Sequence, residues 1–79
     1  MAYRLKDHQA RIDRVEFILR ESLLIDRPET AGELSARLGA DYSFVCAALK
    51  QIRSRPGGVS WIQVPSVGRG RPKLAYRRS

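Results

Sequence analysis

The stretch Thr30–Ile52, TAGELSARLGADYSFVCAALKQI, predicts two short helices that meet at a tight turn. Thr30 followed three residues later by Glu33 is a capping box, in which each side chain satisfies a free backbone amide at a helix start. Gly39 then ends the first of the two helices, because glycine enters the left-handed backbone region at little cost. Asp41 can cap the second helix.

The apolar residues of this stretch recur with helical spacing. The expected buried face comprises Leu34 and Leu38 in the first helix and Val45, Ala48, Leu49 and Ile52 in the second. Two helices joined by a short turn that contains glycine form the helix-turn-helix motif. The second helix of that motif normally lies in the DNA major groove.

The bulk properties predict one small domain of 79 residues. No apolar run approaches the roughly 20 residues of a membrane span, and Met1-Ala2-Tyr3-Arg4 has no signal-peptide pattern. The lone cysteine, Cys46, excludes an internal disulfide and a cysteine-based zinc site. We therefore expect a reducing, cytoplasmic location and no membrane partner.

The net charge of +7 is unevenly distributed along the chain. From Met1 to Leu49 seven basic residues stand against eight acidic ones, whereas from Lys50 onward there are eight basic residues and no acidic one. A terminal region of one sign is what a polyanion-binding surface needs, because each neutralised phosphate releases condensed counterions. A solvated basic tail is the alternative, but such tails rarely contain Trp61, Ile62, Leu74 and Tyr76.

Residues 7–25 predict a first helix, with a core stripe at Ile12, Val15, Ile18, Leu19, Ser22 and Ile25. A second, adjacent face carries Tyr3, Ala10, Phe17 and Leu24 at every seventh position. Two interpretations of this second face stay open. It either widens the contact with the small core or forms a homodimer interface, since an apolar face has to be buried against something.

Pro28 ends the first helix, and the extended segment before Thr30 is a natural place for a short edge strand. His8 has no nearby ligand partners and is expected on the surface, so we expect no metal. The turn cluster after Ile52 stops the second helix of the pair. Val59 to Val64 and Leu74 to Arg77 then predict two strands within a hairpin over 59–77. The loop between these strands is too basic to be buried and is expected to protrude.

The order of a helix, a helix-turn-helix at 30–53 and a two-stranded hairpin resembles the bacterial winged helix-turn-helix transcriptional regulators from about Ile12 to Tyr76. The motif that carries the resemblance is Leu34-Ser35-Ala36-Arg37-Leu38-Gly39, followed by Val45, Ala48-Leu49-Lys50 and Ile52. Ser35 departs from the usual alanine of that family but is small enough to fit. The resemblance implies an α+β fold of three helices and a two-stranded β-hairpin wing in a single domain, 1–79.

The resemblance further implies a recognition helix from Tyr42 to about Arg53. Its outward positions are Tyr42, Ser43, Cys46, Ala47 and Lys50. Tyr42 and Ser43, and the free backbone amides at the start of this helix, can reach phosphates or base edges. The small side chains of Cys46 and Ala47 allow the helix to approach the groove closely. Lys50 is expected to contact phosphate. An alternative role for Cys46 is that of a small buried residue that does not contact DNA. Phe44 is expected to pack this helix against the wing or against the first helix.

Arg69-Gly70-Arg71-Pro72 is similar to the core of the AT-hook, whose arginines lie along a narrow A·T-rich minor groove. We therefore expect a wing that inserts Arg69 and Arg71 there, with Gly70 allowing close approach. A wing that only touches phosphates is the alternative. The other basic residues expected to contact the DNA backbone are Arg53, Arg55, Lys73, Arg77 and Arg78.

The leading hypothesis is a sequence-specific regulator of transcription that binds double-stranded DNA. The alternatives are a nucleoid-associated or architectural protein that binds A·T-rich DNA, and a winged-helix module that binds other proteins. We do not expect an enzyme, because the sequence has no nucleophile–base arrangement, no paired carboxylates in a pocket and no phosphate-cradling loop. No cofactor is expected either.

Overall fold

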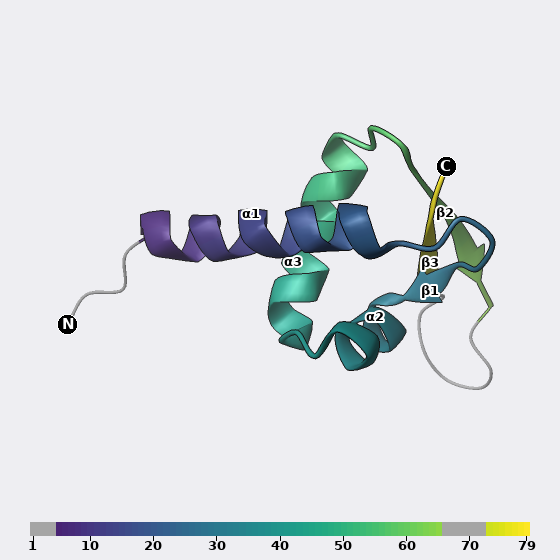
Figure 1. The fold of residues 1–79 in the computed structure, drawn as a ribbon, viewed down its shortest axis with the longest axis horizontal. Coiled ribbons are helices and arrows are strands. Elements are labelled where there is room, and N and C mark those ends of the chain that lie inside the picture. Colours follow the sequence, from purple (N-terminus) through teal and green to yellow (C-terminus); the bar gives the residue numbers. More distant parts are fainter. Residues whose placement is uncertain (1–4, 66–72) are drawn as a thin grey trace.

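The structure is a computed structural model that describes residues 5–65 and 73–79. Within these residues the chain forms three helices and a small antiparallel sheet of three strands (Figure 1). This arrangement is of the α+β class and is winged-helix-like, as the sequence predicts. The elements in chain order are α1 (Leu5–Ser22), β1 (Glu29–Thr30), α2 (Ala31–Leu38), α3 (Tyr42–Ser54), β2 (Val59–Val64) and β3 (Lys73–Arg78).

The α1 helix ends at Ser22 and not at residue 25 as predicted. The carbonyls of its last turn accept hydrogen bonds from arginine side chains of other elements. Arg37 donates to the Ser22 carbonyl at 2.8 Å, and Arg78 donates to the Arg20 and Glu21 carbonyls at 3.1 and 2.7 Å. These donors take the place of the backbone amides that a further turn would supply.

The two helices of the helix-turn-helix begin and end where the local sequence predicts. The Thr30 hydroxyl accepts a hydrogen bond from the Glu33 amide at 3.3 Å, and the Glu33 carboxylate accepts one from the Thr30 amide at 2.9 Å. Gly39 adopts a φ of +64°, in the left-handed region. The Asp41 carboxylate accepts the Ser43 amide at 2.8 Å and caps α3.

The sheet has the strand order β1-β3-β2 and holds the hairpin against the helices. The β2 and β3 strands pair from Val59 opposite Arg78 to Val64 opposite Lys73. The predicted edge strand is present, because β1 pairs with β3 so that Thr30 lies opposite Ala75. This pairing ties the start of α2 to the strand that leads out of the wing.

The core lies between the three helices and the sheet. Its buried apolar side chains are Ile12, Leu19, Leu23, Leu34, Val45, Ala48, Leu49, Ile52, Val59 and Tyr76. Ile18 and Ile25, which were predicted in the core, are 41% and 62% exposed. Ile25 lies beyond the helix end, and Ile18 lies off the stripe that runs through Ile12, Val15, Leu19 and Leu23.

The second apolar face of α1 does not widen the core. Phe17 is 65% exposed and Leu24 is 36% exposed, and Ala10 is exposed as well. Tyr3 lies outside the described residues. Of the two interpretations of this face, the core contact is therefore wrong, and the homodimer interface stays a prediction.

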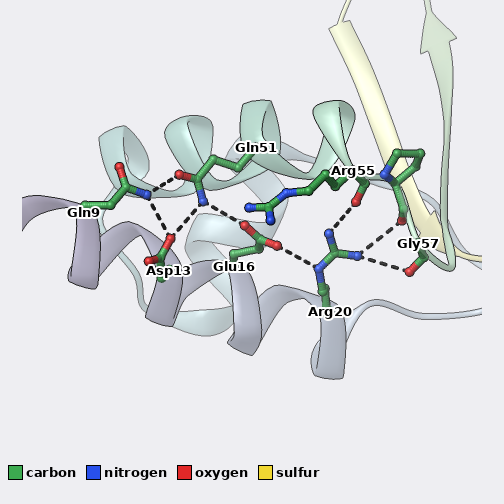
Figure 2. A network of polar contacts seen from close by, with 8 residues as sticks. Gln9, Asp13, Glu16, Arg20, Gln51, Arg55 and Gly57 are labelled. Carbon is green, nitrogen blue, oxygen red and sulfur yellow. Dashed lines mark hydrogen bonds and ion pairs between the residues drawn. The ribbon is translucent and has the colours of Figure 1, made fainter.

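The side of α1 next to this face is fixed to α3 by a row of polar contacts (Figure 2). The Gln51 amide donates to Asp13 at 3.2 Å and to Glu16 at 2.8 Å. Arg20 pairs with Glu16 at 2.9 Å and donates to the Arg55 carbonyl at 2.6 Å, just after α3 ends. One side of α3 is thus committed to α1.

Phe44 and His8 add an aromatic contact between the same two helices. Their ring centroids lie 5.4 Å apart, and both side chains are half-buried. Phe44 is therefore a packing residue. His8 is half-buried rather than on the surface, because its ring lies against this neighbour.

Candidate nucleic-acid interface

One side of α3, next to its outward face, lines a groove that also reaches β3 and the start of α2. We call it the α3–β3 groove, and its volume is about 370 Å³. Tyr42, Cys46, Leu49 and Arg53 contribute from α3 with the spacing of one helix face. The remaining lining residues are Thr30, Ala31, Gly32, Lys73, Leu74 and Tyr76.

The charged residues among the described lining of the groove are both basic. Arg53 and Lys73 are exposed and line it from α3 and from the start of β3, whereas the nearby carboxylate of Glu33, which interacts with the charge of Lys73, is not among the lining residues that the structure describes. Ala31 and Gly32 open α2, so the positive end of that helix dipole is also at the groove. A surface of this kind attracts an anion.

Arg53 is held in place by a contact between α3 and the sheet. Its guanidinium donates to the Tyr76 hydroxyl at 2.5 Å, and the ring of Tyr76 packs against Trp61 with centroids 6.0 Å apart. The sequence predicts Arg53 as a basic contact but gives no sign of its partner, since Tyr76 lies 23 residues further along the chain. The bond positions one cation of the groove with little freedom.

Tyr42 and Cys46 form an adjacent pair on α3. A hydrogen bond with the Cys46 thiol raises the pKa of the Tyr42 hydroxyl above its usual range. The Tyr42 side chain is 58% exposed, whereas Cys46 is half-buried and free of disulfide bonding. Cys46 thus faces the groove and leaves room beside it for a ligand.

The other predicted residues of the recognition helix lie beside the groove. Ser43 and Lys50 are exposed, and Ala47 is half-buried at the edge of the core. The backbone amide of Ser43 is already bonded to the Asp41 carboxylate. The side chains at this helix start, and not that amide, are therefore the groups that can reach a ligand.

Three further predicted backbone contacts, like Lys50, are not among the residues that line the groove. Arg55 follows α3, where its charge helps two hydrogen bonds, from Gln9 and Gln51, to lower the pKa of Asp13 on α1. Arg77 donates to the Ile25 carbonyl at 3.3 Å. The Arg78 guanidinium donates to carbonyls at the end of α1, as described above.

The wing residues Arg69, Gly70 and Arg71 lie outside the described residues. Their predicted role is therefore based on the sequence and is not tested by the structure. Lys73, the first described residue after them, stands at the groove. Sequence reasoning missed the third wall of the groove, which Thr30, Ala31 and Gly32 form. The pairing of β1 with β3 brings that wall into place, and the sequence predicts the short edge strand but not the strand with which it pairs.

In residues 5–65 and 73–79 no group of three or more His, Cys, Asp or Glu side chains is arranged to hold a metal ion. No helix in the same ranges has the length and apolar character needed to cross a membrane.

Comparisons of the chain with known protein families, with curated proteins and with solved structures found no match.

Proposed function

We propose that this protein binds double-stranded DNA through the outward face of α3 and the α3–β3 groove, and that it regulates transcription. The observation that carries the proposal is the shared groove. The predicted recognition helix and the base of the predicted wing meet there, with Arg53 and Lys73 in its walls and no carboxylate among its described lining residues.

The chemistry of this surface suits a phosphate backbone beside base edges. Lys50, Arg53 and Lys73 can neutralise phosphates and release counterions. Tyr42 and Ser43 are exposed at the start of α3, where side chains of a recognition helix contact base edges. No Arg, Asn or Gln stands at the outward positions of α3 before Arg53, so the strongest bidentate base contacts are absent from that part of the helix.

The proposal includes a wing that contacts an A·T-rich minor groove. This part is supported by the Arg69-Gly70-Arg71-Pro72 motif in the sequence and by the place of Lys73 at the groove. Narrow A-tract grooves concentrate negative potential, which attracts arginine. The partners that we propose are double-stranded DNA, in the cytoplasm, and a second copy of this chain through α1.

The first experiment compares two exposed cations of β3. Lys73→Ala removes a charge at the groove, whereas Arg77→Ala removes an equal charge beside Ile25. In fluorescence anisotropy with a labelled duplex, we expect the first change to weaken binding several-fold and the second to have little effect. Equal losses would show that net charge, and not this groove, determines the affinity.

The second experiment tests the wing. Arg71→Ala should weaken binding to duplexes with A·T-rich flanks more than to duplexes with G·C-rich flanks, because only the former offer a narrow minor groove. Dissociation constants for the two duplexes give the ratio directly. An equal loss on both would reduce the wing to a phosphate contact.

Footprinting on genomic fragments separates regulation from DNA coating. A regulator protects discrete sites, whereas an architectural protein gives protection that spreads along the fragment.

A further inference from the structure

The outward face of α1 carries a self-complementary pattern of charge and apolar surface. Its exposed residues include Arg14, Phe17, Ile18 and Glu21, which fall within about 100° of one another around a helix of 3.6 residues per turn. The buried residues Ile12 and Leu19 lie on the opposite side. The outward face is thus distinct from the side that packs on α3.

Apolar side chains are exposed on this face of α1 and just beyond its end. Phe17 and Ile18 are both exposed at its centre, and Leu24 and Ile25 are exposed just after the helix ends. Exposed apolar surface that is contiguous and rimmed by polar residues marks an interaction site.

The two charges on this face have no partner among residues 5–65 and 73–79. Arg14 and Glu21 are seven residues apart, about 10.5 Å along the helix axis, which is too far for an ion pair. Among the described residues neither side chain makes a hydrogen bond or ion pair. By contrast, Glu16 and Arg20 on the inner side pair with each other at 2.9 Å.

We propose that α1 pairs with α1 of a second copy of this chain, antiparallel and around a two-fold axis between Phe17 and Ile18. The midpoint of Arg14 and Glu21 in the sequence is also the midpoint of Phe17 and Ile18. The two-fold axis therefore sets Arg14 opposite the partner's Glu21, twice, and Phe17 opposite the partner's Ile18. A parallel pair would instead set like charges against each other.

The size of the contact predicts a weak dimer. The helix is about 27 Å long and about 10 Å wide, so one face buries less than the roughly 800 Å² per partner of a standard interface. The pairing should therefore depend on concentration, with dissociation on the order of micromolar. No residue of the α3–β3 groove lies on this face, so the proposal does not depend on DNA binding.

Charge-swapped variants test the pairing by sedimentation equilibrium without DNA. Arg14→Glu and Glu21→Arg each turn two attractions into two repulsions and should weaken the dimer about tenfold or more. An equimolar mixture of the two variants should restore it as a heterodimer, because every opposed pair is again of opposite sign. The double variant R14E/E21R should restore the homodimer for the same reason.

Lys50→Glu is the matched control for Arg14→Glu, since it makes the same change in net charge on α3 and should leave the association unchanged when DNA is absent. Circular dichroism of each variant monitors folding, and restoration in the mixture cannot come from a folding defect. A wild-type chain that is monomeric at millimolar concentration would overturn the proposal. So would a dimer that both single variants weaken and that neither the mixture nor the double variant restores.

Discussion

Arginines in the described part of this chain differ in what their guanidinium groups contact. Arg20, Arg37 and Arg78 donate to backbone carbonyls where a helix ends, and thus hold the fold together. Arg53 donates to a side chain and lines the groove. The basic charge of the second half of the chain is therefore divided between structure and the candidate interface.

Glu33 shows how one side chain couples stability to pH. Hydrogen bonds from the Thr30 amide and then the Thr30 hydroxyl lower the pKa of Glu33 below its ordinary value of 4.5. At a pH between the pKa of Glu33 in the folded chain and its ordinary pKa, the unfolded chain binds more protons than the folded chain does. The contribution of Glu33 is therefore complete above about pH 4.5 and is lost as the pH falls through the folded pKa.

Glu33→Gln should make the free energy of unfolding depend less on pH below about 4.5, because glutamine keeps the capping bond but does not titrate. Urea unfolding from pH 7 to pH 3 measures it, with Asp13→Asn as a comparison because the pKa of Asp13 is also lowered. The difference in unfolding free energy between wild type and Glu33→Gln should shrink as the pH falls below about 4.5. A difference that is constant with pH would contradict this assignment.

At the scale of elements, one ion pair between a buried carboxylate and an exposed arginine joins three of them. Glu29 of β1 is 6% exposed, and Arg37 of α2 binds both of its carboxylate oxygens, at 2.8 and 2.7 Å. The same guanidinium donates to the Ser22 carbonyl at the end of α1. The Glu29 carboxylate also raises the pKa of Arg37, chiefly through these hydrogen bonds.

Arg37→Met should lower the free energy of unfolding by about 2 kcal/mol or more, because it leaves a buried carboxylate without a partner. The double variant R37M/E29Q should recover part of the loss, since a neutral amide is less costly to bury. Urea denaturation of both variants measures the two effects. A loss below about 0.5 kcal/mol for Arg37→Met would mean that water replaces the arginine there.

Across the whole molecule, the sequence predicts those features whose signals are local. Thr30 with Glu33, Gly39 and Asp41 mark the helix-turn-helix because capping depends on neighbours a few residues away. The end of α1 could not be predicted, because Arg78 reaches it only in the folded chain.

In the candidate site too, the sequence predicts features that depend on local spacing but not those that depend on the folded chain. The helical spacing of Tyr42, Cys46 and Arg53 predicts that they share a face. Arg55 and Arg77 were assigned by charge alone, and the structure places both of them outside the groove lining. Charge in a sequence shows how many cations are present but not where their side chains point.

The central claim is that the α3–β3 groove and the adjoining face of α3 bind the DNA backbone, and the salt dependence of duplex affinity tests it most directly. With Lys50, Arg53 and Lys73 on phosphates, the logarithm of the association constant should fall against the logarithm of salt concentration with a slope of about −2.7 or steeper. Lys73→Ala should reduce that slope by about 1, and Arg77→Ala should leave it unchanged. A wild-type chain that does not bind duplex DNA at low salt, or whose affinity is independent of salt, would contradict the claim.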